Sequence, residues 1–323
     1  MKDRRRILVT GGAGFIGSHL VERLVGDGAA VTVLDDLSTG LLSNLSAVAD
    51  EIHFIEASVT EGIAGLDASF DEIHHLAATV GVMLVVDEPI RTIETNILET
   101  VSILEFGAAS DASVLITSTS EVYGKSDELP YCEDADLVFG PTTHSRWCYG
   151  CSKAVDEHLA VAWHRERGVP VRIARLFNTI GPRQRGRWGM VVPRFVAAAL
   201  AGEPLVVHGD GEQTRCFADV GDVVPMLLSM MANDECRGQV VNVGSDRPIS
   251  INDLARLVVA VLGSRSTIEH HAVAEVYGEG FEDLRDRRPD LSKCRALLGC
   301  VPETPLEATI RSVAAGMSAG NQC

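Results

Sequence analysis

The sequence predicts an α/β protein with a doubly wound parallel sheet and a smaller mixed α/β C-terminal substrate domain. The first observation is that short, β-branched apolar runs alternate with helical patterns. The second is that these runs are apolar throughout, which is typical of strands covered on both faces. The third is size, because 323 residues with 46% hydrophobic and 23% charged content can bury a large core without stabilising disulfides or metal ions.

The predicted elements follow one another in a regular order over the first half of the chain. Strands are expected at Ile7–Thr10, Val31–Leu34, His53–Ile55, Ile73–Ala77, Val114–Ser118 and Val171–Phe177. Helices are expected at Phe15–Gly26, Pro89–Ala109 and Trp147–Gly168. The alternation becomes irregular after Phe177, where residues 181–188 are rich in arginine and glycine. A second domain is therefore expected to include residues 179–218 and 246–323, with residues 219–245 rejoining the first.

Net charge and cysteine content limit the cell compartment and the kinds of partner that we expect. The formal charge of −17 argues against nucleic acid or an anionic membrane as a partner. The basic residues 1–6 are not followed by the long apolar segment and cleavage site of a signal peptide, and no run approaches the ~18 apolar residues of a membrane helix. Eight irregularly spaced cysteines suit a reducing cytoplasm. Cys148 and Cys151 form a C-x-x-C pair without a second pair at zinc spacing, so no metal is expected.

A glycine-rich loop joins the first predicted strand to the first helix. Residues 10–17 read TGGAGFIG, which matches both G-x-G-x-x-G and G-x-x-G-x-x-G. Glycines there allow a tight turn and let backbone N–H groups approach a pyrophosphate at the helix N-terminus. Asp35 ends the second strand 18 residues after Gly17, where a carboxylate can bind ribose hydroxyls and repel a 2′-phosphate. Residues 1–178 are therefore interpreted as a Rossmann-type domain that binds NAD rather than NADP.

Tyr149 and Lys153 are candidates for proton transfer. They stand four residues apart on a predicted helix, so they share one face. An ammonium ~4 Å from the phenol would supply up to ~4 kcal/mol at an effective dielectric of ~20, which approaches three pKa units. A phenolate beside a nicotinamide could then take a hydroxyl proton while hydride leaves the same carbon. This reasoning predicts that Lys153 lowers the pKa of Tyr149.

Taken together, these motifs resemble the extended short-chain dehydrogenase/reductases that modify nucleotide sugars, over about residues 7–302. Further segments that carry the resemblance are residues 75–78 (HLAA), 95–96 (TN), 117–124 (TSTSEVYG), 175–178 (RLFN), 181–183 (GPR), 209–215 (GDGEQTR) and 219–222. Within the family, the chain looks most like UDP-glucuronic acid decarboxylases. This choice is based on Ser120-Glu121 after Thr119, on Arg146-Trp147 before Tyr149, and on residues 277–291.

The resemblance implies an oxidative decarboxylation of UDP-glucuronic acid. Tyr149 would deprotonate the C4 hydroxyl while NAD takes the C4 hydride, and the resulting 4-keto acid would lose C6 as CO2. Glu121, Ser120 and Arg287 would position the carboxylate and manage the C5 proton. Return of the hydride would give UDP-xylose, whereas early release would give the UDP-4-keto-pentose.

The resemblance also implies which residues form the site. The catalytic residues would be Thr119, Ser120, Glu121, Tyr149, Lys153 and Arg287. The NAD-binding residues would be Gly11, Gly14, Phe15, Ile16, Gly17, Asp35, Asp36, Ser58, Val59, Leu76, Ala77, Ala78, Asn96, Tyr149 and Lys153. The substrate-binding residues would be Glu121, Tyr149, Asn178, Arg183, Arg185, Arg215 and Arg287.

Several alternatives remain open at this point. A nucleotide-sugar 4-epimerase and a 4,6-dehydratase share most of these motifs, and residues 79–82 also resemble epimerases. A noncatalytic NAD-binding sensor is a further alternative. The family commonly has an adenine-contacting aspartate at the position of Ser58, so backbone groups of Ser58 and Val59 would have to make that contact here. Helices 89–109 and 147–168 are apolar on more than one face, so both are expected to be buried on two sides. The family resemblance implies a homodimer that joins these helices.

Overall fold

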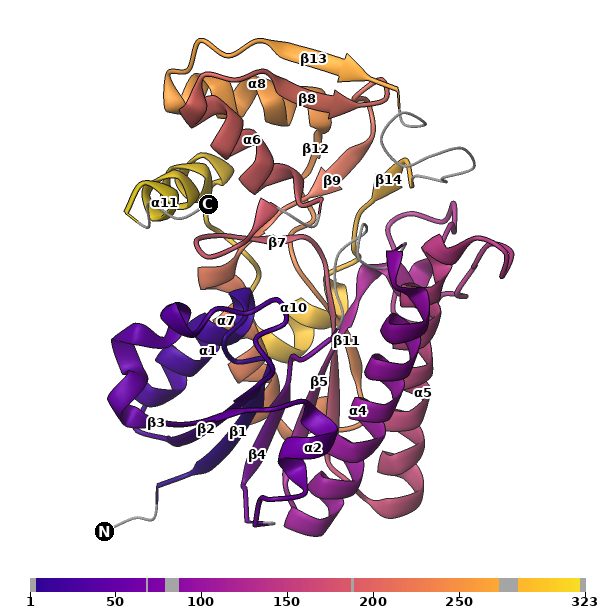
Figure 1. Ribbon diagram of the computed structural model, residues 1–323. Coiled ribbons are helices and arrows are strands. Elements are labelled where there is room, and N and C mark those ends of the chain that lie inside the picture. The colour runs from indigo at the N-terminus through magenta and orange to yellow at the C-terminus, as the bar shows by residue number, and fades with distance from the viewer. Residues whose placement is uncertain (1–3, 68, 79–86, 187–188, 273–283, 320–323) are drawn as a thin grey trace.

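The computed structural model describes residues 4–67, 69–78, 87–186, 189–272 and 284–319. Residues 79–82 and 277–283, which contributed to the resemblance, lie outside these ranges. In the described part, seven parallel strands form one sheet in the order β11-β6-β5-β4-β1-β2-β3 (Figure 1). They are β1 (Arg6–Thr10), β2 (Ala30–Asp35), β3 (Ile52–Glu56), β4 (Glu72–His75), β5 (Ser113–Thr119), β6 (Val171–Leu176) and β11 (Val240–Val243). The order reverses between β1 and β4, which confirms the predicted Rossmann-type, doubly wound fold.

Helices cover both faces of this sheet. One face carries α2 (Val59–Ile63), α4 (Pro89–Ser110) and α5 (Cys148–Arg167). The other carries α1 (Phe15–Gly26), the short helix η1 (Leu42–Glu51), α7 (Val220–Ala232) and α10 (Ser292–Leu298). The strands are buried between these layers, which explains why their sequences are apolar throughout. The predicted first-half elements agree with the structure within two residues. The fourth strand stops at His75 because the N–H of Ala77 bonds to the Thr10 side chain.

The remaining elements lie above the carboxyl ends of the strands (Figure 1). They include α6 (Val191–Ala201), α8 (Ile251–Leu262) and α11 (Leu306–Ala319), which share one apolar core with β8 (Leu205–His208) and β13 (Ile268–His271). Small strands complete this part: β7 (Thr179–Ile180), β9 (Thr214–Cys216), β10 (Ala218–Asp219), β12 (Pro248–Ser250) and β14 (Asp286–Arg287). Among the described residues, no helix combines the length and apolarity needed to cross a bilayer.

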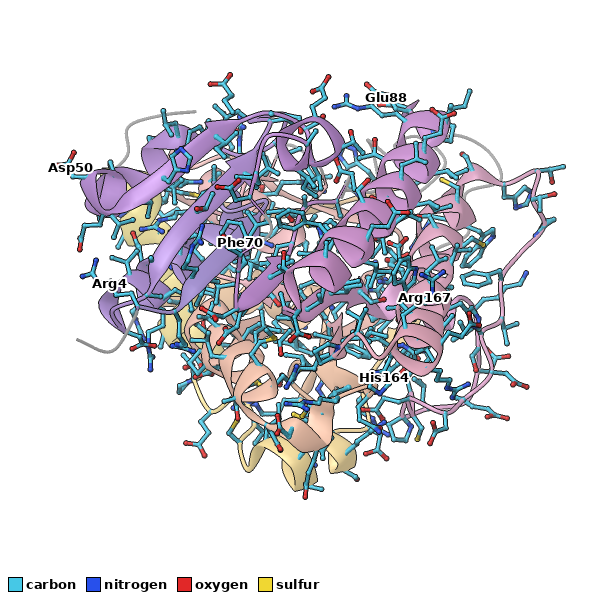
Figure 2. The ribbon with its side chains drawn as sticks, turned by 90° about the horizontal axis from the view of Figure 1, so that it is seen from below. Arg4, Asp50, Phe70, Glu88, His164 and Arg167 are labelled. Atoms are coloured by element: carbon cyan, nitrogen blue, oxygen red, sulfur yellow. The ribbon has the colours of Figure 1, made fainter. Side chains whose placement is uncertain are left out.

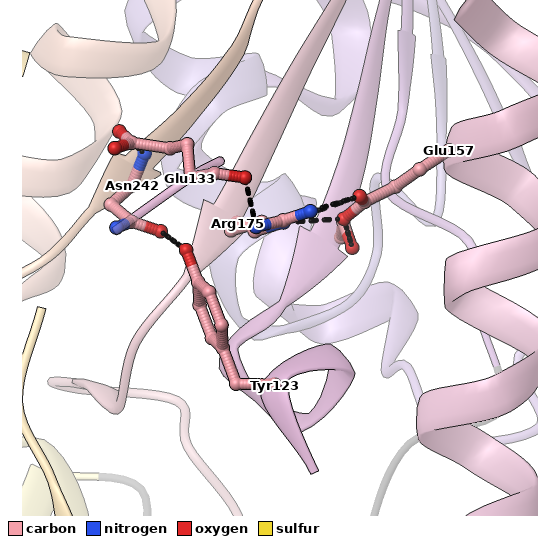
Figure 3. Close-up of polar contacts among 6 residues, drawn as sticks. Tyr123, Glu133, Glu157, Arg175 and Asn242 are labelled. Atoms are coloured by element: carbon pink, nitrogen blue, oxygen red, sulfur yellow. Dashed lines mark hydrogen bonds and ion pairs between the residues drawn. The ribbon is translucent and has the colours of Figure 1, made fainter. Parts of the chain in front are cut away.

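A buried polar network fixes α5 against the sheet (Figure 3). The Arg175 guanidinium on β6 donates to both carboxylate oxygens of Glu157 on α5, at 2.7–3.2 Å. Ser118 at the end of β5 donates to the same carboxylate at 2.5 Å. Arg175 also lies over the Tyr123 ring, whose hydroxyl donates to Asn242 on β11 at 2.7 Å. A bidentate, charge-assisted pair of this kind holds α5 in a defined register on the sheet.

The far end of α5 is closed by local interactions. The helix ends at Gly168, which adopts a left-handed φ of +72°. His164 Nδ1 contacts the carbonyl of Val169 at 2.8 Å, and the Arg167 guanidinium lies 5.2 Å from the Trp163 ring centre. Figure 2 views the molecule from below and shows His164 and Arg167 at this end of α5. The positive charge of Arg167 also interacts favourably with the negative end of the helix dipole. α5 is therefore anchored near its middle by the network around Arg175 and at its C-terminal end by these contacts.

Candidate active site

A cavity of about 700 Å³ lies where the upper elements meet the carboxyl edge of the sheet. Most of the site residues predicted from the sequence line it: Gly11, Gly14, Phe15, Ile16, Gly17, Asp35, Asp36, Ser58, Val59, Leu76, Ala77, Ala78, Thr119, Ser120, Glu121, Tyr149, Asn178, Arg183, Arg185, Arg215 and Arg287. Asn96 and Lys153 are buried and are not among the residues that line it, and Asn96 donates to Ser152 at 3.0 Å. Residues that are far apart in the sequence thus share a single cavity.

The glycine loop has the shape that a dinucleotide requires. Gly11 has a left-handed φ of +69°, and a Cβ there would lie 2.7 Å from the backbone nitrogen of Ala77. A Cβ at Gly17 would lie 2.1 Å from the carbonyl oxygen of Gly11. The loop leads into the N-terminus of α1, with Gly14 as the N-cap residue. Only glycine therefore fits at these two positions, and the loop places the N-terminus of α1 at the cavity, an arrangement that suits a pyrophosphate.

Asp35 organises the adjoining part of the cavity. Its carboxylate accepts hydrogen bonds from the backbone N–H groups of Ala13 and Leu37, both at 2.9 Å. Burial raises the pKa of Asp35, and these two hydrogen bonds oppose that rise. A carboxylate offers about four acceptor sites, so two remain for ribose hydroxyls. The glycine loop and Asp35 together fit NAD, which has no 2′-phosphate for this carboxylate to repel.

Tyr149 is the second residue of α5 and is buried, with 8% of its surface exposed. Burial raises the pKa of Tyr149, the Glu121 charge raises it further, and a hydrogen bond with Thr119 lowers it. The Lys153 ammonium is paired with the buried Asp156 carboxylate at 2.8 Å. The pKa of Tyr149 is thus raised where the sequence reasoning predicted a lowered one, and a contribution of Lys153 to that pKa stays a prediction. Asp156 follows Lys153 by three residues, so the sequence contained this competing partner.

Next to Tyr149, one carboxylate is paired with two arginines. Glu121 lies in the short helix η2 (Ser120–Tyr123) and forms ion pairs with Arg146, from η3 (Ser145–Trp147), and with Arg287, from β14. Burial would raise the pKa of Glu121, but Arg287 and Arg146 outweigh it and lower the pKa to about 2. The three side chains are largely buried and together carry one net positive charge. A buried net cation of this kind can bind an anionic group that enters the cavity.

The remaining predicted substrate residues differ in how free their polar groups are. Arg183 is paired with Glu22 at 2.6 Å and donates to Ser18, so α1 already neutralises its charge. Arg215 donates to the carbonyl of Thr214 at 2.8 Å, while Arg185 is exposed at the rim. The side-chain amide of Asn178 donates to the carbonyl of Cys216 at 3.2 Å. Of the predicted substrate residues Arg183 and Arg185, Arg185 thus has the more accessible charge.

Arg146 and Glu99 are among the cavity residues that were not predicted as site residues. Arg146 contributed to the family resemblance, but its pairing with Glu121 was not foreseen. Glu99, on α4, lines the cavity near Ser58 and Val59 and is 7% exposed. The sequence held a signal for Glu99, because polar residues recur at positions 92, 96, 99 and 100, on a face of α4 that is buried. Buried polar side chains need hydrogen-bond partners, so such a face indicates a polar network or a bound ligand.

The fold and the cavity together define a dinucleotide-binding protein of the Rossmann class. Residues 7–244 match the NAD dependent epimerase/dehydratase family, and the chain belongs to that family. Its cofactor is NAD, in agreement with the position of Asp35.

Several individual members of the family are similar to this chain over most of its length. The chain is 37% identical over 311 residues to UDP-N-acetyl-alpha-D-glucosaminuronate decarboxylase of Bacillus cytotoxicus, covering 95% of this chain and 96% of that protein. It is 39% identical over 306 residues to UDP-glucuronic acid decarboxylase 1 of Xenopus tropicalis, covering 95% of this chain and 70% of the relative. Among solved structures, DesIV, a dTDP-glucose 4,6-dehydratase of Streptomyces venezuelae with NAD and TYD bound, gives a TM-score of 0.87 at 27% identity and 98% coverage of each chain.

Proposed function

We propose that this protein catalyses the NAD-dependent oxidative decarboxylation of UDP-glucuronic acid, giving the UDP-4-keto-pentose, UDP-xylose or both. The observation that supports this most directly is the pairing of Arg146 and Arg287 with Glu121 beside Tyr149. Its net positive charge matches the carboxylate of a sugar acid. The neutral hexoses used by the alternative 4-epimerases and 4,6-dehydratases would leave this charge uncompensated.

Residues of the first domain would hold the cofactor. The glycine loop from Gly11 to Gly17 would bind the pyrophosphate, and Asp35 would bind a ribose. Bound NAD would accept hydride from C4 of the sugar, and the positive charge of its nicotinamide would favour the phenolate of Tyr149. We assign NAD binding to residues 1–178 with 219–245, and nucleotide-sugar binding to residues 179–218 and 246–323.

Tyr149 would take the proton of the C4 hydroxyl as the general base. The ketone formed at C4 makes the substrate a β-keto acid, so the C5–C6 bond breaks and C6 leaves as CO2. The electron pair of that bond moves onto the C4 oxygen as an enolate, and protonation at C5 gives the 4-keto-pentose. Because the pKa of Glu121 is lowered to about 2, its carboxylate stays ionised and orients Arg146 and Arg287 instead of donating this proton. Solvent ordered by the Ser120 hydroxyl would supply the proton.

A second candidate substrate differs at C2 of the sugar. The Bacillus cytotoxicus relative, which this chain matches over nearly its whole length, is described as acting on UDP-N-acetylglucosaminuronate. Its substrate has the same carboxylate at C6, so the cluster of Glu121, Arg146 and Arg287 would suit either sugar. The test must therefore include both sugars.

The decisive experiment incubates the purified full-length protein with NAD+ and one nucleotide sugar at a time. Release of CO2 together with a pentose nucleotide from UDP-glucuronate would support the proposal. Release of CO2 from the N-acetylated sugar alone would select the second candidate. Inversion at C4 without CO2 release would identify an epimerase, and loss of water from a neutral sugar would identify a dehydratase. Bound NAD without turnover of any sugar would favour the sensor.

We further propose a homodimer formed through α4 and α5. Both helices pack on the sheet with one side, yet they expose apolar side chains on the other: Ile90 (71%), Ile93 (39%), Leu98 (57%) and Val155 (41%). Exposed apolar residues clustered on neighbouring helices mark a surface suited to a protein partner. Sedimentation at micromolar concentration should give twice the chain mass of 34.6 kDa, and a monomer mass would contradict the dimer.

A further inference from the structure

The position of Asp35 determines where the adenine of the dinucleotide must lie. The acidic residue at the end of the second strand of this fold binds the adenosine ribose. β3 is paired with β2 on the side away from β1, with Asp35 opposite Glu56. A base attached to that ribose therefore meets the residues that follow Glu56, which are Ala57, Ser58 and Val59. All three line the cavity.

The Ser58 side chain is already committed at this end of the cavity. Ser58 is the N-cap of α2, and its oxygen accepts a hydrogen bond from the N–H of Glu61 at 3.4 Å. Its hydroxyl donates to the Glu61 carboxylate at 2.7 Å. The first bond satisfies one backbone N–H of the first turn of α2, and the second uses the only donor of the Ser58 side chain. Ser58 therefore has little to offer the adenine amino group, which needs an acceptor.

A carboxyl group reaches the same place from another element. Glu99 lies on α4, and its carboxyl group accepts a hydrogen bond from the backbone N–H of Val59. Only 7% of the residue's surface is exposed. Its Oε2 is buried and has no hydrogen-bond partner among the described residues. Leaving such an acceptor unpaired is costly, so a natural protein seldom keeps one without a use.

We propose that Glu99 recognises the adenine base of NAD by accepting a hydrogen bond from its 6-amino group. This inference rests on NAD binding by the cavity and not on the decarboxylation, so either can fail without the other. Carboxylates accept hydrogen bonds from amino groups of bases and repel carbonyl oxygens. Glu99 would therefore distinguish adenine from hypoxanthine, which has a carbonyl group at that position.

The test compares two ligands and four forms of the full-length protein. The ligands are NAD+ and nicotinamide hypoxanthine dinucleotide, and their dissociation constants are measured by calorimetry on protein freed of bound nucleotide. The proteins are the wild type, Glu99→Gln, Glu99→Leu and the control Glu105→Leu, which changes an exposed glutamate of the same helix. Titration at about pH 8.5 keeps the Glu99 carboxylate ionised, so it can only accept hydrogen bonds.

The wild type and Glu105→Leu should bind NAD+ about tenfold or more tightly than the hypoxanthine analogue. Glu99→Leu should weaken NAD+ about tenfold and leave the analogue nearly unchanged, so that the preference disappears. Glu99→Gln is nearly isosteric, and its amide can face either base, so the preference should fall toward one even if the leucine variant does not fold. Equal binding of both ligands by the wild type, or an unchanged preference in Glu99→Gln, would overturn the proposal.

Discussion

Glu121 and Glu99 are both largely buried glutamates on the wall of one cavity, but their surroundings shift the pKa of the carboxyl group in opposite directions. Two guanidinium groups contact Glu121, and they lower its pKa to about 2 against the effect of burial. Burial raises the pKa of Glu99 to about 7, and among the described residues no arginine or lysine forms an ion pair with it. One end of the cavity therefore contains an excess of positive charge, and the other contains an uncompensated acceptor.

The difference teaches how one cavity can serve two ligands. The end with Tyr149 and Glu121 carries a net positive charge, so it suits a negatively charged group of the substrate that takes part in the reaction. The end with Glu99 and Ser58 is prepared for hydrogen bonding to a neutral base. Substitutions at the first end should change turnover, whereas substitutions at the second should change cofactor binding.

The largest loss of activity is expected for Tyr149→Phe, which tests whether one end of the cavity governs turnover and the other governs cofactor binding. Removing the hydroxyl deletes the proposed base, so turnover of UDP-glucuronate should fall about 1,000-fold or more. NAD+ affinity should stay within about twofold, because the glycine loop and Asp35 would still hold the pyrophosphate and a ribose. Single-turnover assays and calorimetric NAD+ titrations on the same preparation measure the two quantities. Wild-type turnover would remove Tyr149 from the role of base.

The same change of charge at the two glutamates should have different effects on stability. Glu121→Gln leaves two buried arginines without their carboxylate, and should reduce the free energy of unfolding by about 3–5 kcal/mol. Glu99→Gln keeps the shape and removes an ionisation that burial opposes, so at about pH 8 the free energy of unfolding should be unchanged or higher. Urea unfolding of both variants beside the wild type decides the point. Equal losses of stability would show that the two ends do not differ as described.

The contrast between these two glutamates also shows what sequence reasoning could reach. The glycine loop, Asp35 and the strand–helix order were predictable because each depends on local backbone geometry or on periodicity. Glu121 and Arg287 were placed through family resemblance. The partners of charged groups were not predictable in the same way, because pairing depends on which side chains tertiary packing brings within reach. Lys153 bonding to Asp156, and Arg146 to Glu121, are examples.

Arg287→Met should have the next largest effect. Loss of this guanidinium removes the excess charge around Glu121, so kcat/KM for UDP-glucuronate should fall about 100-fold, while UDP binding stays unchanged. The control is Arg285→Met, which changes an exposed arginine two residues earlier whose contact with Asp210 is 3.7 Å long. If both variants lost activity equally, or if UDP binding fell in parallel with kcat/KM, Arg287 would not be serving the sugar carboxylate.

The smallest expected effect is a difference in the pH dependence of stability. A raised pKa means that folded Glu99 holds its proton where the unfolded chain releases it, so its contribution to stability is complete below the unfolded pKa near 4.5 and is lost as pH rises to about 7. The charged groups that face it are Asp36 at the end of β2 and Lys153 and Asp156 on α5. Between pH 5 and pH 7, the wild type should lose about 2 kcal/mol more than Glu99→Gln.

Glu121 should change the free energy of unfolding with pH in the opposite direction. Its lowered pKa makes its contribution complete above about pH 4.5 and lost as pH falls toward 2, so Glu121→Gln should flatten the acid limb of the stability curve and leave the slope above pH 5 intact. Urea unfolding at one-unit pH steps, on protein freed of nucleotide, measures both slopes. A Glu99→Gln curve parallel to the wild type between pH 5 and pH 7 would mean that Glu99 ionises in the folded protein as it does in the unfolded chain.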